Sequence, residues 1–256
     1  RGKQEFQHLK HLINNESSLS ASEIWSMYED RSGVLWFGSF MAGINMLQPT
    51  QTVFKNWRHD PLNGKSLSEN SIMAFAENPD STLWIGADHG GLMLYDRKEG
   101  LIKHYVNDPN DNKSLSSNSV LSLLLDSENV LWVGTWAGGL NRFNPETNNF
   151  TRYVPNENNP DAISNLHIWD IFEDSKGRYW ISTMGGGLNR FEREENKFYH
   201  YKKFNSKGIT SNTSWKTIED SDGNIWTATA NGLCLYDENE DIFINFQHDD
   251  KNKQSL

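Results

Sequence analysis

A tryptophan recurs along this chain of 256 residues at nearly constant spacing. The intervals between successive copies are 48, 48, 48 and 46 residues. Each copy follows a large apolar residue, in the pairs Leu35-Trp36, Leu83-Trp84, Leu131-Trp132, Tyr179-Trp180 and Ile225-Trp226. A unit of about 40 to 50 residues is too small to bury its own apolar surface, so it must stack on copies of itself. The sequence therefore predicts an array of similar units.

Each unit contains four short runs that read as β-strands. In the third unit these runs are residues 119–126, 131–135, 138–143 and 150–153. They are rich in aliphatic, β-branched and aromatic residues, and Gly, Asn, Asp or Pro separates them. No stretch has a helical period long enough to compete with this pattern. We therefore expect each unit to be one blade of four antiparallel strands, a, b, c and d in chain order.

The regularity of the packing residues distinguishes a propeller from a sandwich. A glycine and an aliphatic residue follow the strand-b tryptophan by seven residues in four units and by six in the fifth, at Gly43-Ile44, Gly91-Leu92, Gly139-Leu140, Gly187-Leu188 and Gly232-Leu233. A sandwich needs alternating strands but no fixed repeat, whereas radially packed blades need the same packing residues in every copy. The prediction is an all-β propeller with about five four-stranded blades, in which the five tryptophans lie buried between blades.

The strand count predicts that the chain is one arc of a larger propeller, which we expect to be of the seven-bladed type. Phe6 to Lys10 reads as the strand d of a preceding blade within residues 1–20. The five blades are predicted at residues 21–58, 59–106, 107–154, 155–203 and 204–247, and residues 248–256 read as the loop to a missing blade. The alternative is a closed ring of five blades with one irregular strand.

Composition limits the partners of the chain. Its 34 acidic and 24 basic residues give a net charge of −10, which argues against a nucleic-acid partner because phosphates reward clustered Lys and Arg. Cys234 is the only cysteine and is expected to be a small buried residue of a strand c. Residues 220–224 resemble the start of a calcium loop, but Asn231 stands where the bidentate Glu would be. No metal, cofactor or membrane-spanning segment is predicted.

The connections between blades carry a resemblance to a known family. Residues 59–68 and 107–116 share an Asp-Pro and a Lys-Ser-Leu-Ser, and Asp-x-x-Gly, Leu-Trp-Ile/Val-Gly and Gly-Gly-Leu-Asn-Arg-Phe follow. These motifs resemble the two-component regulator propeller repeat over nearly the whole chain. The last repeat departs from it, because Thr227 and Ala228 follow Trp226 and the next loop is one residue shorter.

That resemblance implies a periplasmic sensor region of a hybrid two-component system of Bacteroides-type bacteria. Such regions continue into further propeller blades, a β-sandwich domain, a membrane helix, a histidine kinase, a receiver and a DNA-binding domain. The resemblance implies an oligosaccharide as the ligand. None of the kinase motifs occurs in these 256 residues, so phosphotransfer is expected elsewhere.

The loops between strands b and c are expected to carry a ligand, because loops on a rigid scaffold usually hold binding groups. Four residues after the strand-b tryptophan, the units carry Phe40, Asp88, Trp136 and Met184. Trp136 is the one tryptophan with no counterpart in the repeat. An indole stacks on the apolar face of a sugar ring while nearby polar groups bind its hydroxyls. Trp136 is therefore the leading candidate, and packing on a neighbouring loop is the alternative.

Two histidines complete the candidate set. His89 follows Asp88 and either orients a ligand hydroxyl or is merely solvated. His167 stands at the entry to a strand a, where the other units carry Glu23, Ser71, Ser119 and Thr213. Asp170 and Lys216 share one repeat position and are expected to form an ion pair between adjacent blades. A second shared position holds Trp25, Trp169 and Trp215, which are expected in the blade core.

Two other functions are compatible with the sequence. The Gly-x-x-Trp turns resemble the Asp-box of sialidase-type propellers, which suggests a glycan-cleaving enzyme. Arg142 and Arg190 occupy the same repeat position, so they are expected to be structural, and no catalytic residue stands out. The third function is a structural propeller that docks another protein or forms a homodimer.

Overall fold

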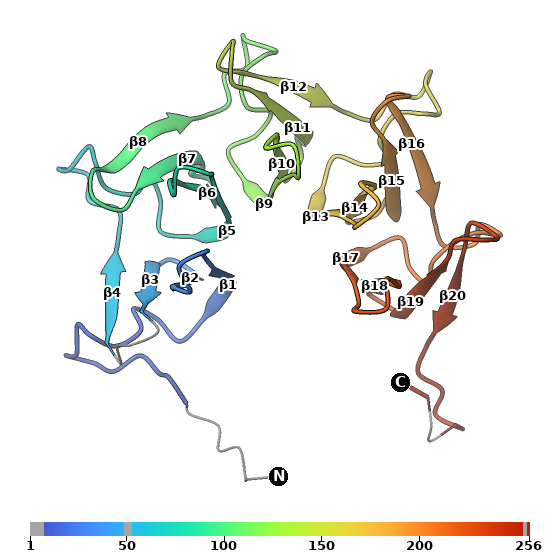
Figure 1. Ribbon diagram of the computed structural model, residues 1–256, viewed down its shortest axis with the longest axis horizontal. Coiled ribbons are helices and arrows are strands. Elements are labelled where there is room, and N and C mark those ends of the chain that lie inside the picture. The colour runs from blue at the N-terminus through green and yellow to red at the C-terminus, as the bar shows by residue number, and fades with distance from the viewer. Residues whose placement is uncertain (1–7, 49–52, 253–254) are drawn as a thin grey trace. The chain divides into compact units, whose positions relative to one another are not determined.

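The structure, a computed structural model, describes residues 8–48, 53–252 and 255–256. Within these ranges the chain forms strands and turns and no helix. The strands assemble into five four-stranded antiparallel sheets, each in chain order (Figure 1). The prediction of an all-β propeller built from four-stranded antiparallel blades is confirmed.

The strands follow one another in the same order in every blade. Blade 1 contains β1 (Ile24–Glu29), β2 (Leu35–Ser39), β3 (Gly43–Leu47) and β4 (Phe54–Trp57). Blade 2 contains β5 (Ile72–Glu77), β6 (Leu83–Ala87), β7 (Gly91–Asp96) and β8 (Gly100–Tyr105). Blade 3 contains β9 (Val120–Leu125), β10 (Leu131–Thr135), β11 (Gly139–Asn144) and β12 (Asn149–Tyr153). Blade 4 contains β13 (Ile168–Glu173), β14 (Tyr179–Thr183), β15 (Leu188–Glu192) and β16 (Lys197–Tyr201). Blade 5 contains β17 (Ser214–Glu219), β18 (Ile225–Thr229), β19 (Gly232–Asp237) and β20 (Ile242–Phe246).

The chain divides into two compact parts of several blades each, which we call the first unit and the second unit. Arg1–His104 contains blades 1 and 2, and Tyr105–Leu256 contains blades 3, 4 and 5. Phe6 and Gln7, in the predicted strand d of a preceding blade, lie outside the described residues, and His8, Leu9 and Lys10 form no strand.

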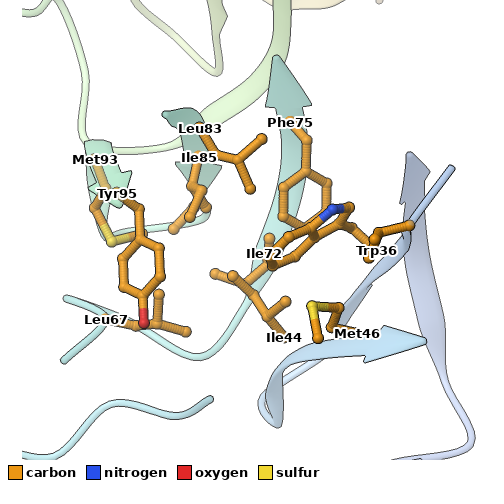
Figure 2. Packing of buried hydrophobic residues seen from close by; sticks show 12 residues of the cluster. Trp36, Ile44, Met46, Leu67, Ile72, Phe75, Leu83, Ile85, Met93 and Tyr95 are labelled. Atoms are coloured by element: carbon orange, nitrogen blue, oxygen red, sulfur yellow. The ribbon is translucent and has the colours of Figure 1, made fainter. Parts of the chain in front are cut away.

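The strand-b tryptophans form the core between neighbouring blades. In the first unit Trp36 of β2 packs beside Ile72 and Phe75 of the next blade (Figure 2). In the second unit Trp132 packs in one cluster with residues of blade 4, and Trp180 packs in another with residues of blade 5. The exposed fraction is 5% or less for four of the five indoles, and Trp226 is half-buried. Burial of the indoles is thus confirmed for four blades.

A carboxylate or amide in the turn between strands a and b accepts the indole N–H in every blade. The acceptor stands six residues before the tryptophan, at Asp30, Asn78, Asp126, Asp174 and Asp220, and the distances are 2.6, 2.8, 2.8, 2.8 and 2.7 Å. A buried N–H without a partner is costly, so this bond is what allows the indole to be buried. The Asp-x-x-Gly motif does not by itself reveal this role of the Asp side chain.

A glutamate at the end of strand a ties a blade to the turn of the blade before it. The Glu173 carboxylate accepts hydrogen bonds from the backbone N–H and the hydroxyl of Ser127, at 2.7 and 2.6 Å. Glu219 binds Ser175 in the same way, at 2.7 and 2.5 Å. Neighbouring blades of the second unit are therefore joined by polar contacts as well as by their apolar cores.

Asp241 gives this unit a predicted acid sensitivity. Burial raises the pKa of Asp241, but hydrogen bonds from Lys207, Tyr201 and Tyr236 and the charge of Arg190 outweigh it and hold that pKa at about 2. A carboxyl group whose pKa is lower in the folded state stabilises the fold at pH values above its pKa in the unfolded state. This stabilisation is lost as the pH falls through the pKa of the folded state. Asp241→Asn should cost about 2 kcal/mol at pH 7.

The test is urea unfolding of the native chain and Asp241→Asn between pH 7 and pH 2. The difference between the two proteins should shrink from about pH 4 downwards and be small near pH 2, where Asp241 is protonated in the unfolded state and about half protonated in the native state. A difference that is constant over this range would contradict the assignment.

Candidate functional site

The loop between strands b and c is held to the start of strand a in every blade. Its backbone N–H donates to the carbonyl oxygen of the residue that precedes strand a. The pairs are Phe40 to Glu23, Asp88 to Ser71, Trp136 to Ser119, Met184 to His167 and Ala230 to Thr213, with distances from 2.9 to 3.2 Å. The backbone therefore fixes where these side chains start and leaves their chemistry free to differ between blades.

The same loops rest on the d-to-a connection of the next blade. In the first unit the Gly43 N–H donates to the Asn70 carbonyl oxygen at 2.8 Å. In the second unit Gly139 donates to Leu166 at 2.8 Å and Gly187 to Asn212 at 2.7 Å. Within each unit, the b-to-c and d-to-a loops therefore lie side by side on one face. We call this face of the second unit, formed by its b-to-c loops and the residues that enter strands a, the loop rim.

Trp136 and His167 come together on the loop rim. Their rings stack with centroids 4.1 Å apart and an angle of 12° between planes. The Ala137 N–H donates to His167 Nδ1 at 3.0 Å. Because a backbone N–H can only donate, Nδ1 carries a lone pair and the proton of the neutral imidazole lies on Nε2. Trp136 remains 38% exposed and His167 is half-buried, so the stack presents aromatic surface to solvent.

Met184 adjoins this stack through the backbone of blade 4. Its N–H donates to the His167 carbonyl oxygen at 3.1 Å, and Met184 pairs with Thr213 of blade 5 in an isolated β-bridge. The Met184 side chain is half-buried. Three of the six sequence-predicted site residues therefore meet where blades 3, 4 and 5 adjoin at the loop rim.

The other three predicted site residues belong to the first unit. Phe40 stacks on Trp25, with centroids 4.9 Å apart and an angle of 12°. His89 Nδ1 lies 3.1 Å from the Asp88 carboxylate, and their side chains are 81% and 29% exposed. Ser71 joins the two loops, because its hydroxyl accepts from the Met41 N–H and its carbonyl from the Asp88 N–H. Phe40 and Asp88 are half-buried and His89 is exposed, so their place in a ligand site stays a prediction.

The strand-a tryptophans correct the sequence analysis. Trp25 is 43% exposed, and Trp169 and Trp215 are half-buried, so none of the three lies in the blade core. The reason is a register shift at this position in all five blades, which leaves one extra residue of strand a unpaired. A β-bulge breaks the alternation of side chains and re-aims the extra residue. A two-residue period cannot reveal such a shift.

Two contacts join the bulges of blades 4 and 5. Trp169 and Trp215 meet edge to face, with ring centroids 5.0 Å apart. The next residues form the predicted ion pair, in which Lys216 Nζ lies 2.7 Å from Asp170 Oδ1. That prediction is confirmed. Asp170 Oδ2 also accepts the Thr217 N–H at 3.0 Å, so both carboxylate oxygens are used.

Two hollows among the described residues contain none of the six candidates. A cavity of about 180 Å³ in the second unit is lined by residues such as Arg152, Ile163 and Phe198. A larger one of about 680 Å³ in the first unit is lined by residues such as His11, Phe54 and Trp57. Over the described ranges, no three His, Cys, Asp or Glu side chains gather as a metal site would require. No helix capable of crossing a membrane occurs in the same ranges.

Comparison with known proteins identifies the repeats. The family model described as two component regulator propeller matches residues 18–41, 114–137 and 162–185. Each match runs from the d-to-a connection through strands a and b, in blades 1, 3 and 4. Three segments of the chain thus match this repeat. No curated protein sequence matches it.

Solved structures share the fold. The extracellular domain of BT3049 from B. thetaiotaomicron, described as a hybrid two component system, is 25% identical with a TM-score of 0.76, over 93% of this chain and 30% of that one. The extracellular domain of BT4673 from the same organism is 15% identical with a TM-score of 0.65, over 97% and 40% of the two chains. Virginiamycin B lyase from Staphylococcus aureus is 12% identical with a TM-score of 0.61, over 89% and 69%. This chain therefore spans less than half the length of the extracellular domains of BT3049 and BT4673.

Proposed function

We propose that this chain, built from two-component regulator propeller repeats, is the ligand-sensing part of a hybrid two-component system. Its ligand is an oligosaccharide, and the signal passes to a histidine kinase outside this segment. The sensing part lies in the periplasm and continues into further propeller blades and a β-sandwich domain of the same chain. The three repeat matches and the likeness to the extracellular domain of BT3049 support the sensor role.

The Trp136–His167 stack is the observation that carries the choice of ligand. The blade does not need an indole at this place, since the other b-to-c loops carry Phe40, Asp88 and Met184. Stacked rings offer an apolar face to a sugar, and the Nε2–H of His167 can donate to a hydroxyl. Largely apolar surface with a few placed polar groups is the usual composition of a small-molecule site.

Removal of the Trp136 ring is expected to weaken oligosaccharide binding. Loss of one stacked aromatic contact should lower affinity about tenfold, in line with about 0.5 to 1.5 kcal/mol for an aromatic pair beyond its buried area. The measurement is calorimetric titration of the 256-residue chain and of Trp136→Ala with an oligosaccharide library. Phe204→Ala is the matched control, because Phe204 is an aromatic residue of the same unit that is 93% exposed and lies in the connection from β16 to β17 rather than in a b-to-c loop. Equal affinity in Trp136→Ala and the native chain would remove Trp136 from the site.

The proposal also holds that this segment binds a glycan without cleaving it. The residues that meet at the loop rim are aromatic rings, an imidazole and a thioether rather than a pair of carboxyl groups of the kind glycosidases use. Incubation with the same library, followed by chromatography of the products, tests this. Cleavage that a single Asp or Glu substitution abolishes would establish the enzyme instead.

A further inference from the structure

We propose that the bulges of blades 4 and 5 form a second subsite, which selects sugars that carry an anionic group, a carboxylate or a sulfate. Its parts are the Trp169–Trp215 ring pair and the ammonium group of Lys216. The inference rests on the proposed function, because it names the class of glycan that the loop rim binds.

The two contacts of this subsite lie side by side. Trp169 and Trp215 are the unpaired bulge residues of β13 and β17, and Asp170 and Lys216 are the residues that follow them. The ring pair and the ion pair therefore cross between the same two strands at consecutive positions. A sugar that stacks on the half-buried indoles has the ammonium group beside it.

Asp170 holds the positive charge in place. Its side chain is only 9% exposed and both of its oxygens are occupied, one by Lys216 Nζ and the other by the Thr217 N–H. The Lys216 side chain, in contrast, is 64% exposed. An ammonium group has three N–H donors and no acceptor, so the exposed end of this pair offers donors and positive charge. The oxygens of a carboxylate or a sulfate accept these hydrogen bonds and also carry the opposite charge. Neutral hydroxyls can only accept the hydrogen bonds.

The packing of the blade does not require these residues. The counterparts of Asp170 and Lys216 in blades 1, 2 and 3 are the small residues Ser26, Ala74 and Ser122. The bulge position itself holds Met73 in blade 2 and Leu121 in blade 3. A charged pair beside two indoles is thus specific to blades 4 and 5, in the unit that also carries the Trp136–His167 stack.

The subsite also adjoins that stack. His167 stands two residues before Trp169 at the entry to β13, and Thr213, which bridges to Met184, stands two residues before Trp215. Two residues of extended chain cover about 6.6 Å. An oligosaccharide can therefore place one sugar on Trp136 and His167 and another on the Trp169–Trp215 pair.

The test is calorimetric titration of the 256-residue chain with matched pairs of oligosaccharides. Uronic-acid oligosaccharides are compared with their carboxyl-reduced forms, sulfated ones with their desulfated forms, and neutral ones serve as the reference. We expect the ligands that bind to be anionic, and the neutralised partner to bind about fivefold more weakly, as for a partly exposed charge pair. A preference within the uronic-acid pair would identify a carboxylate as the anionic group, and a preference within the sulfated pair would identify a sulfate.

Variants of Lys216 distinguish a role in selecting anionic ligands from a role in stabilising the fold. In Lys216→Met the preference for the anionic partner should fall to about one, and Lys216→Arg should keep it. A structural role would lower the affinity for both members of a pair equally, which would overturn the proposal, as would equal binding of the two members by the native chain. Binding of neutral oligosaccharides alone would overturn the subsite and leave the sensor intact. Binding of no oligosaccharide would overturn the proposed function itself.

Discussion

Trp180→Ala is expected to lower the free energy of unfolding by about 4 kcal/mol, the largest stability loss among the single substitutions considered for this chain. The Trp180 side chain is fully buried and contacts the rings of Tyr201, Tyr236 and Phe243. Removal of the indole leaves a cavity between blades 4 and 5. It also removes one hydrogen-bond donor from the buried carboxylate of Asp174. The cavity and the loss of a hydrogen-bond partner for a buried charge both lower the free energy of unfolding.

Trp136→Ala is the matched control for this substitution. Trp136 is also a tryptophan of the second unit, but it is 38% exposed and is not the strand-b indole of its blade, which is Trp132. We expect it to change stability by less than about 1 kcal/mol. Urea unfolding followed by circular dichroism measures both. Similar losses in the two variants would show that the strand-b indoles are not the packing core of the blades.

Gly134→Ala is expected to destabilise the chain by about 2 kcal/mol, although it adds one methyl group. A Cβ atom at this position would lie 2.2 Å from the Ser122 hydroxyl oxygen and 2.7 Å from Cγ2 of Ile168. The hydroxyl can rotate away, but Ile168 is fully buried and belongs to strand a of the next blade. Its β-branched side chain has little freedom to move. The added methyl group therefore pushes blade 3 away from blade 4.

Gly64→Ala serves as the control for this prediction. A Cβ atom there would meet nothing within 4 Å, so stability should stay within about 0.5 kcal/mol of the native chain. Thermal unfolding of both variants is the measurement. The double variant Gly134→Ala, Ile168→Ala should cost less than the sum of the single changes, because Ile168→Ala removes the atom that clashes. Additive costs would place the strain elsewhere.

This contact also explains where the repeat departs from its pattern. The strand-b glycines Gly38 and Gly134 lie against Ile72 and Ile168, the first residues of strand a in the following blades. In blade 5 that first residue is Ser214, and blade 4 accordingly carries Ser182 in place of the glycine. The Ser182 hydroxyl lies 3.3 Å from the Thr217 hydroxyl, and Ser214 accepts the Thr183 N–H at 3.1 Å. A polar contact replaces the close apolar one between these two blades.

Part of the candidate site could be predicted from the sequence. Trp136 was identified because the repeat gives no reason for an indole there, and the Asp170–Lys216 pair because opposite charges share one repeat position. The stack of Trp136 on His167 could not be predicted, because the two residues belong to different blades and are 31 positions apart. The roles of Trp169 and Trp215 were misassigned for another reason, since a bulge changes the direction of a side chain and leaves the spacing of the repeat unchanged.

The sequence by itself determined the blade. The order of the strands, the positions of the turns and the burial of the strand-b tryptophans follow from a repeat whose copies must all pack in the same way. Such constraints can be read from the residues of a single repeat. Only the tertiary structure decided which unrepeated residues meet. Trp136 lies on His167, Trp169 meets Trp215, and Lys216 binds Asp170. Each of these contacts joins neighbouring blades, and the last two also involve the bulges of strand a. Periodicity carries no information about such contacts, because it shows only the residues that the blades have in common. Recognition depends on the residues that differ between blades.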